Sequence, residues 1–196
     1  MVSGEERADR IVTTAVELAG AGGFEAVRLR DVASNAGVAL GTLYRHFHSK
    51  EDLLVAALAR ESDAVERHFE LKPARGETAL ERLTNFFRTT TRMLCRRPKL
   101  LRAVLRAAAS GDPGLAERVE RFHRRSTQWV VAALRGESFS ELRGPEQDVA
   151  ELLQQVWFTL LVGWAGGLHS QAEIVEKVRT AAEILLRGAG LDGRSG

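Results

Sequence analysis

The sequence predicts an all-α protein of about nine helices, in which an N-terminal three-helix head precedes a larger C-terminal helical domain. Apolar residues recur every three or four positions along most of the chain, as they do on the buried face of a helix. Glycine and proline separate these stretches, and no stretch shows the alternation of apolar and polar residues that is typical of strands. We place the domain boundary after residue 48, so that the two domains comprise residues 1–48 and 49–196.

The composition is that of a globular protein with a sizeable core, since 44% of the 196 residues are hydrophobic and 28% are charged. The net charge is only +2, so contacts with a polyanion would require local clustering of basic residues. The single cysteine, Cys95, excludes an internal disulfide bond and favours a cytoplasmic location. The apolar stretch Val156 to Leu168 is too short to span a membrane, so we expect a buried or interface helix there and no membrane partner.

The first helix is predicted over Glu5 to Ala21. Its apolar residues, among them Ile11 and Val12, follow helical spacing, and acidic residues occupy the first turns, where the helix dipole favours negative charge. Several glycines follow and end the helix. We expect its apolar face to pack on the two helices that come next.

Those two helices are predicted over Leu29 to Ala36 and over Leu40 to Phe47. Gly37 lies between them and can adopt the left-handed conformation that ends a helix. In the second helix, Leu43 and Phe47 lie four residues apart on one face, so we expect both in the core. Two short helices joined by a glycine-containing turn form a helix-turn-helix, whose second helix can enter a DNA major groove.

The larger domain is predicted to contain six further helices. Ser49 can cap the free amide of Asp52 at the start of the first of them, and Pro98 and Pro113 occupy first turns, where proline is best tolerated. The predicted helices run from Ser49 to Phe69, Thr78 to Cys95, Pro98 to Ala109, Pro113 to Leu134, Glu146 to Leu168 and Gln171 to Arg187. We expect a loop over Gly136 to Arg143.

The run Gly22 to Leu54 resembles the DNA-binding signature of the TetR family of transcriptional regulators. The residues that match the family pattern are Gly23-Phe24, Ala36-Gly37-Val38, Gly41-Thr42-Leu43-Tyr44, Phe47 and Ser49-Lys50-Glu51. The resemblance implies a homodimer that binds a double-stranded, palindromic DNA operator and responds to a small-molecule effector through its second domain. It also implies that the common mode is repression, which ends when a small hydrophobic effector releases the operator. A transcriptional activator, or a DNA-binding regulator that does not respond to a ligand, is the alternative.

Positive charge is concentrated in the helix-turn-helix, as a contact with DNA requires. Four bases and one acid lie between Arg28 and Lys50, which gives a local balance of +3. Through the resemblance, the candidate DNA-binding residues are Arg28, Arg30, Leu40, Gly41, Thr42, Tyr44, Arg45, His46 and Lys50.

The resemblance assigns roles to several of these residues. Tyr44, His46 and Lys50 match positions that touch the DNA backbone or the edge of the groove, and Lys50 would bind a phosphate beside the amino end of the next helix. Arg30 matches a position that can read a guanine, whose O6 and N7 suit a guanidinium. Arg28 departs from the family pattern, which commonly has Thr or Ser there, so the second helix lacks its usual hydroxyl cap.

Large apolar residues are spread over several helices of the larger domain, where the resemblance implies a small-molecule pocket. Most such residues in any protein form plain core. The residues that we expect to line the pocket are Phe87, Met93, Trp129, Phe158 and Leu161.

The stretch between Glu81 and Asp112 contains eight bases and no acid. Arg88, Arg92 and Arg96 recur every four residues, so like charges on one helix face repel each other. Ion pairing with distant acids, or exposure to solvent, would account for them. A sharper hypothesis is an anionic effector, for instance an acyl or steroid coenzyme A thioester, bound by Arg92 and Arg96. The signature and the pattern of the larger domain also resemble the KstR-like regulators of lipid and sterol breakdown.

The last two predicted helices resemble the dimer interface of the family, since their apolar positions exceed what one core face needs. Two such pairs could form a four-helix bundle across a two-fold axis. The expected interface residues are Leu153, Trp157, Leu160, Trp164, Ile174, Val178, Ala181 and Leu185.

Nothing in the sequence indicates an enzyme. The five histidines do not form a metal-ligand pattern with carboxylates or with the cysteine, and no phosphate loop, dinucleotide fingerprint or nucleophile motif occurs. We therefore expect no catalytic residue, no metal site and no cofactor.

Overall fold

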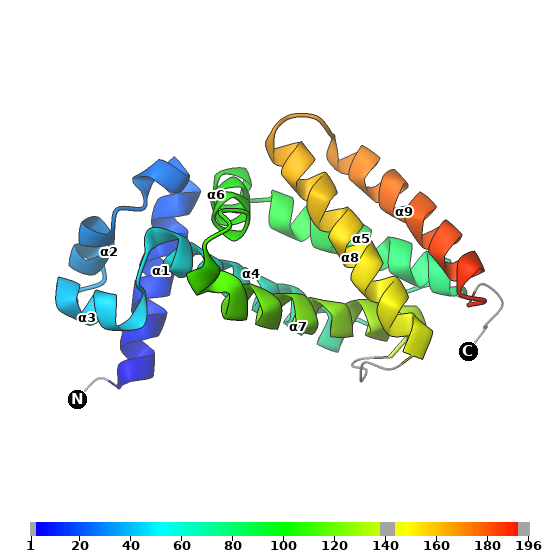
Figure 1. The fold of residues 1–196 in the computed structure, drawn as a ribbon, viewed down its shortest axis with the longest axis horizontal. Coiled ribbons are helices and arrows are strands. Elements are labelled where there is room, and N and C mark those ends of the chain that lie inside the picture. The colour runs from blue at the N-terminus through cyan, green and yellow to red at the C-terminus, as the bar shows by residue number, and fades with distance from the viewer. Residues whose placement is uncertain (1–2, 138–143, 192–196) are drawn as a thin grey trace. The chain divides into compact units, whose positions relative to one another are not determined.

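The computed structural model of the chain describes residues 3–137 and 144–191, and these ranges contain nine α-helices and no strand (Figure 1). The helices are α1 (Gly4–Gly22), α2 (Leu29–Asn35), α3 (Leu40–His46), α4 (Lys50–Leu71), α5 (Ala79–Cys95), α6 (Pro98–Ala108), α7 (Ala116–Arg135), α8 (Gly144–Ala165) and α9 (Gln171–Gly188). The all-α prediction is confirmed, and each predicted helix is present within a few residues of its expected bounds. The loop predicted over Gly136 to Arg143 lies mostly outside the described residues.

Two of the predicted boundaries differ from the structure for local reasons. The helix expected from Pro113 begins as a 3-10 turn, because the Asp112 side chain accepts a hydrogen bond from the backbone N–H of Gly114 at 2.9 Å and tightens the chain there. At the other end of the domain, α8 stops before Leu168, since Gly167 has a φ of +83° that a helix does not allow.

The helices form two compact units. Unit 1 comprises Met1–Ser62 and Arg97–Glu120, and unit 2 comprises Asp63–Arg96 and Arg121–Gly196. Unit 1 therefore contains α1, α2, α3 and α6 with the first parts of α4 and α7. Unit 2 contains α5, α8 and α9 with the remaining parts of α4 and α7.

Unit 1 has a core of its own, in which α1 packs on α2, α3 and α6. Side chains from four helices are buried in it, namely Ile11, Ala15, Val32, Leu43 and Leu53. The helices α2 and α3 have only seven residues each, too few to be stable in isolation. Their stability therefore depends on this apolar packing.

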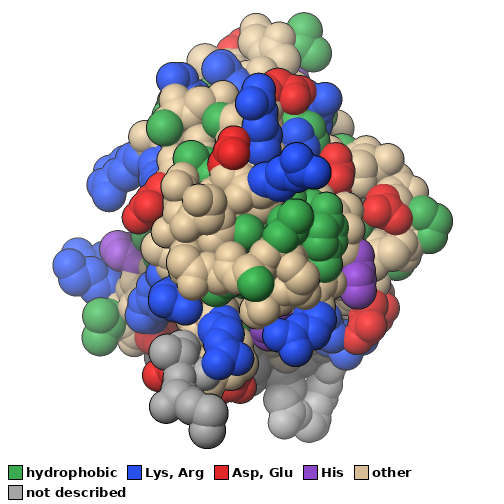
Figure 2. All heavy atoms as spheres, turned by 90° about the vertical axis from the view of Figure 1, so that its left-hand side faces the viewer, with side chains coloured by type: hydrophobic (Ala, Val, Ile, Leu, Met, Phe, Trp, Pro, Cys, Tyr) green, Lys and Arg blue, Asp and Glu red, His purple; other side chains and the backbone are tan. Residues whose placement is uncertain are grey.

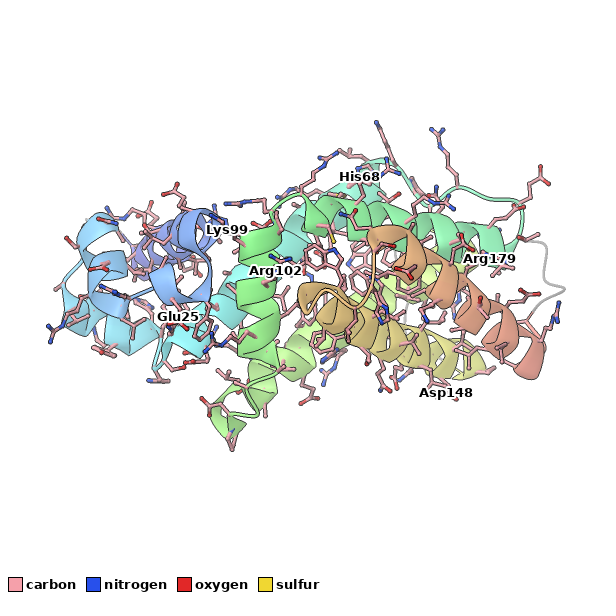
Figure 3. The ribbon with its side chains drawn as sticks, turned by 90° about the horizontal axis from the view of Figure 1, so that it is seen from above. Glu25, His68, Lys99, Arg102, Asp148 and Arg179 are labelled. Atoms are coloured by element: carbon pink, nitrogen blue, oxygen red, sulfur yellow. The ribbon has the colours of Figure 1, made fainter. Side chains whose placement is uncertain are left out.

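Basic residues at the start of α6 bind the C-terminal end of α1. The Arg97 guanidinium donates to the carbonyl of Val16 at 3.3 Å, and the Lys99 ammonium donates to the carbonyl of Ala21 at 2.7 Å (Figure 3). Cations are stabilising at this end of a helix, where the helix dipole is negative. Arg97 also pairs with Glu61 at 3.2 Å. Part of the run of bases noted in the sequence is thus explained by capping and ion pairing.

Unit 2 is built around α9, which packs on both α5 and α8 (Figure 1). Leu83, Phe87, Leu153 and Ile174 are fully buried in its core. The Phe87 ring lies 5.3 Å from the ring of Phe86, so the core contains a packed aromatic pair.

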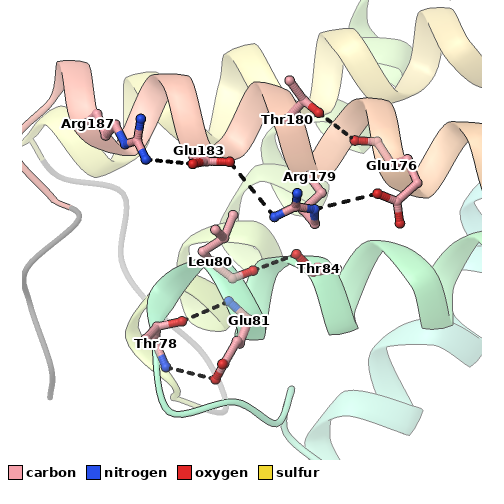
Figure 4. Close-up of polar contacts among 9 residues, drawn as sticks. All are labelled: Thr78, Leu80, Glu81, Thr84, Glu176, Arg179, Thr180, Glu183 and Arg187. Carbon is pink, nitrogen blue, oxygen red and sulfur yellow. Dashed lines mark hydrogen bonds and ion pairs between the residues drawn. The ribbon is translucent and has the colours of Figure 1, made fainter.

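Both α5 and α9 begin with a capping box. Thr78 accepts from the N–H of Glu81 while the Glu81 carboxylate accepts from the N–H of Thr78 (Figure 4). Ser170 and Glu173 make the same exchange at the start of α9. The hydrogen bonds from Ser170 lower the pKa of the Glu173 carboxyl.

Arg82 is a buried base with a structural role. Its side chain is 8% exposed and donates to the carbonyl of Leu134, at the end of α7, at 2.7 Å and to the carbonyl of Glu77 at 3.0 Å. A guanidinium there satisfies carbonyls that have no partner within the helix and complements the negative end of the dipole. Arg82 thereby joins α5 to α7 inside unit 2.

A buried polar network also connects α7 to α8. The hydroxyl of Thr127 lies 2.6 Å from the Gln154 side-chain oxygen, and the Gln154 amide nitrogen lies 2.8 Å from Nδ1 of His123. With the amide in this orientation, its nitrogen donates to Nδ1 of His123, and an imidazole that accepts there is neutral. Burial also lowers the pKa of His123, which favours the neutral form of the imidazole as well.

This network predicts a loss of stability in mild acid. Because the folded pKa of His123 is lowered, the unfolded chain binds the proton more readily, and stability is lost as the pH falls through about 6.5, the usual value for histidine. We expect the urea midpoint of the wild type to fall between pH 7.5 and pH 5.5, roughly the window around that value, by more than that of His123→Gln. Equal pH dependence in the two proteins would contradict the assignment.

Cys95 is buried, and burial raises the pKa of its thiol to about 11, so the thiol stays protonated at neutral pH. Within the described ranges, none of the helices combines the length and the apolar character that a membrane span requires.

Candidate functional site

The helix-turn-helix is present in unit 1 as α2, a tight turn and α3. Gly37 has a φ of +63°, the left-handed conformation that the sequence led us to expect, and its N–H donates to the carbonyl of Ser34 at 3.1 Å. The N–H of Val38 donates to the carbonyl of Ala33 at 3.0 Å, which closes the turn. These two bonds end α2 and set the direction in which the chain continues into α3.

The outer face of α3 carries most of the candidate DNA-binding residues. Tyr44 is 48% exposed, and Gly41 and Arg45 are also exposed, whereas Leu43 and Phe47 on the opposite face are buried. The partly buried members of the set are Leu40, Thr42 and His46. Figure 2 looks onto this side of the molecule and shows more Lys and Arg than Asp and Glu side chains on the visible surface.

The two arginines before and in α2 are exposed as well. Arg28 is the N-cap residue of α2 and forms no side-chain capping hydrogen bond, so α2 begins without the usual hydroxyl cap. Arg30 lies in the first turn beside Asp31. Both guanidinium groups are therefore free to reach a phosphate or a base edge.

Lys50 is half-buried in a cluster that the sequence did not reveal. Its ammonium lies 3.9 Å from the centre of the Phe24 ring, donates to the Phe24 carbonyl at 3.3 Å and approaches Glu25 at 3.7 Å. On the same ring, Arg106 of α6 lies 4.0 Å from the centre, and it pairs with Glu25 at 2.9 Å. Lys50 is thus held by the head, and a phosphate would have to compete with Glu25 for it.

The start of α4 is capped as the sequence predicted. The N–H of Asp52 donates to the Ser49 hydroxyl at 3.0 Å. The Asp52 carboxylate in turn accepts from the N–H of His48 at 3.0 Å. These two bonds fix the short connection between α3 and α4.

The candidate ligand-binding residues lie in the interior of unit 2 or at its margin. Phe87, Trp129 and Leu161 are buried, whereas Met93 and Phe158 are partly exposed. The Phe158 ring lies 6.0 Å from the ring of His123, and the Phe87 ring lies 5.7 Å from that of Trp157. The structure therefore places Phe158 beside the buried polar network.

An open groove of about 280 Å³ runs along α5 and α9. Its lining includes two of the regularly spaced arginines, Arg88 and Arg92, together with Thr91, Gln171 and Glu176. Arg96, at the C-cap of α5, is also exposed. The spacing seen in the sequence thus gives a basic stripe on the surface of unit 2.

A second open groove of about 540 Å³ shares Arg88 and adds Arg75 and Arg179. Arg179 lies 3.6 Å from Glu176 and 3.9 Å from Glu183, so part of this positive charge is already balanced (Figure 4).

The expected interface residues fall into two groups. Those buried within the single chain are Leu153, Trp157, Leu160, Ile174 and Val178, and those partly exposed are Trp164, Ala181 and Leu185. The large apolar side chains that these two helices expose to solvent are instead Leu152, Val162 and Ile184. Trp164, Ala181 and Leu185 therefore remain partly accessible beside these exposed neighbours.

Within the part of the chain that the structure describes, no group of three or more His, Cys, Asp or Glu side chains is placed to hold a metal ion.

Two family models match the chain. The model of bacterial regulatory proteins of the tetR family matches residues 11–57, which include α2 and α3. The model of the tetracyclin repressor-like C-terminal domain matches residues 76–185.

Relatives that are similar over most of the chain are transcriptional repressors. KstR of Rhodococcus jostii strain RHA1 is 34% identical over 93% of this chain and 84% of its own length. KstR of Mycobacterium tuberculosis is 31% identical over 92% of this chain and 81% of its own length.

Solved structures share the fold. A TetR transcriptional regulator from Rhodococcus sp. RHA1 has a TM-score of 0.80 and 28% identity, with 93% of this chain and 96% of that chain covered. Thermus thermophilus FadR in complex with lauroyl-CoA has a TM-score of 0.72 and 20% identity, with 92% of this chain and 94% of that chain covered.

Proposed function

The chain belongs to the TetR family of transcriptional regulators, which are not enzymes, and on this premise we propose that it is a homodimeric repressor of a palindromic operator. In the proposal, α3 of each copy reads one half of the operator, and a small hydrophobic effector bound in the second domain releases the DNA. Residues 1–48 would supply the DNA-binding domain, and residues 49–196 would supply effector binding and dimerisation.

The observation that carries the proposal is the division of α3 into two faces. Leu43 is fully buried against the head, while Tyr44 and Arg45 on the other side of the same helix are exposed to solvent. An exposed short helix with hydroxyl, aromatic and basic side chains suits a major groove, whose edges present acceptors and donors between phosphates.

The exposed apolar side chains of α8 and α9 support the proposed dimer. Leu152, Val162 and Ile184 are more than a third exposed, and association of two copies would remove them from water. Two heads are also needed for tight binding, because a single head contacts few phosphates. The two-fold symmetry of the dimer would then match a palindrome with half-sites about 34–36 Å apart.

An acyl or steroid coenzyme A thioester is the effector that we propose. The apolar side chains near Trp129 and Phe158 would accept the hydrocarbon part, and the stripe that includes Arg92 and Arg96 would bind the phosphates. The lauroyl-CoA in the FadR structure supports this class of ligand. Release of DNA would be a population shift, in which the effector prefers the state that does not bind.

The effector proposal is tested by fluorescence anisotropy on a labelled duplex that the wild-type chain binds. We expect lauroyl-CoA to release the duplex, and coenzyme A or laurate alone to be much weaker, because each supplies only one half of the contacts. The double variant Arg92→Ala, Arg96→Ala should need a higher lauroyl-CoA concentration, by about tenfold or more for two lost charge-assisted contacts.

The exposed Arg67 of α4 provides a matched control, and Arg67→Ala should respond as the wild type does. In a second set of anisotropy measurements, a steroid coenzyme A thioester replaces lauroyl-CoA. If neither thioester releases the bound duplex, the chain is a regulator of another ligand class or of none, and the effector part of the proposal is overturned.

A further inference from the structure

Arg118, in the first turn of α7, contacts the end of α3. Its Nε lies 2.6 Å from the Asp52 carboxylate, and its Nη2 donates to the carbonyl of His46 at 3.5 Å. The guanidinium also lies over the ring of Phe47, 5.5 Å from the ring centre. All of these residues belong to unit 1.

Asp52 makes this contact more than a surface ion pair. The residue is only 4% exposed, and one carboxylate oxygen accepts from the N–H of His48 while the other pairs with Arg118. A buried carboxylate without a partner is costly, because it has lost its hydration. Arg118 therefore stabilises the charge that holds the connection between α3 and α4 in place.

The end of α3 is short and has carbonyls that a cation from another helix can reach. This helix has seven residues, and its C-cap residue, Phe47, is in an extended conformation with a φ of −139°. Carbonyls in the last turn of a helix lack partners within the helix and attract cations. The Arg118 guanidinium supplies such a cation from a different helix, next to His46.

We infer that Arg118 is a positioning residue for DNA reading: it fixes the orientation of α3 through Asp52 and the carbonyl of His46 without touching DNA. The inference rests on the proposed function, since it assumes that α3 reads the operator. A small rotation of α3 would move Tyr44 and Arg45 away from base edges while leaving contacts between the protein and phosphates largely possible. Arg118 should therefore affect specificity more than overall affinity.

The competing explanation is that Arg118 itself binds a phosphate. Loss of a phosphate contact weakens binding to every sequence by a similar factor, whereas loss of orientation weakens binding to the correct sequence alone. The ratio of the two dissociation constants, for operator and for unrelated duplex, distinguishes these cases. A general loss of folding would also lower both affinities together.

The experiment uses the full chain and a duplex that the wild type selects from a random-sequence pool. For Arg118→Met, we expect the Kd for this duplex to rise by about tenfold, comparable to one mismatched base pair, while the Kd for an unrelated duplex changes by less than about twofold. Asp52→Asn keeps an acceptor for His48 but removes the charge, and it should give the same loss of specificity. The double variant should bind about as well as the weaker single variant, because the two changes remove one interaction.

Two further variants serve as controls, one for the charge of Arg118 and one for the loss of an exposed arginine elsewhere. Arg118→Lys keeps the charge beside Asp52 but lacks the fork that also reaches His46, so its specificity ratio should lie between those of the wild type and Arg118→Met. Arg67→Met should match the wild type. Equal losses for both duplexes, or an unchanged ratio in Arg118→Met and Arg118→Lys, would overturn the inference. Failure of the wild type to select any duplex would instead overturn the proposed function.

Discussion

Replacing Phe87 by alanine is expected to lower the free energy of unfolding of unit 2 by about 3–5 kcal/mol, the usual cost of removing a fully buried aromatic ring. Phe87 is 1% exposed and its ring packs between those of Phe86 and Trp157, at centre distances of 5.3 and 5.7 Å. Trp157 is itself fixed by a hydrogen bond to Thr91 at 2.9 Å, so the surroundings cannot collapse easily into the space that the substitution creates. Urea unfolding followed by tryptophan fluorescence measures this loss.

The fluorescence signal reports on unit 2 alone, because all three tryptophans of the chain lie in it. Leu71 is 83% exposed, and Leu71→Ala serves as the control, with an expected change within about 0.5 kcal/mol. A loss below about 1 kcal/mol for Phe87→Ala would mean that the ring borders a cavity rather than a packed core. That result would favour the pocket-lining role for Phe87.

Gly41→Glu is expected to abolish specific DNA binding and to leave the fold intact. Gly41 is exposed on α3, and a Cβ atom added there meets no other atom within 4 Å. A glutamate would place a carboxylate against base edges and phosphates in both halves of the operator. Because contacts between like charges cost several kcal/mol, we expect the affinity for DNA to fall by at least about 100-fold. Anisotropy with the selected duplex gives the affinity.

Two variants separate charge from folding effects. Gly41→Ala adds only a methyl group and should lose much less affinity. Leu71→Glu introduces the same side chain at an exposed position of α4, outside the proposed interfaces, and should bind as the wild type does. Thermal unfolding should show Gly41→Glu to be at least as stable as the wild type, because glycine is a poor helix former. If Gly41→Glu bound the selected duplex with wild-type affinity, α3 would not be part of the DNA interface.

The fold was predictable because its signals are local. Capping by Ser49, the left-handed Gly37 and the helical spacing of apolar residues each involve neighbours within a turn or two. The position of α3 as an exposed helix with Leu43 inward follows from the same short-range pattern.

Contacts between distant segments were not predictable. Lys99 and Ala21 are far apart in the sequence, as are Arg118 and Asp52, and no periodic pattern pairs them. The eight bases between Glu81 and Asp112 were therefore read as one feature, although Arg82 binds carbonyls inside unit 2 and Arg97 caps α1 in unit 1.

The expected dimer-interface residues show what helical periodicity cannot predict. Apolar residues lie on nearly all sides of α8, so periodicity cannot tell the face that packs on α9 from the face that meets solvent. The sequence favoured Leu153 and Trp157, which are buried within the chain, whereas the neighbouring Leu152 is exposed. The packing of α9 on α5 and α8 decides which face is inward, and that packing depends on the whole of unit 2.

The most direct test of the account is a hydroxyl-radical footprint of the wild-type chain on the duplex that it selects, combined with the mass of the complex. We predict two protected half-sites related by two-fold symmetry, with centres about 10–10.5 base pairs or a multiple of that apart, and two or four copies of the chain per duplex. Protection of a single asymmetric site by one copy, or no sequence selected at all, would contradict the paired presentation of α3.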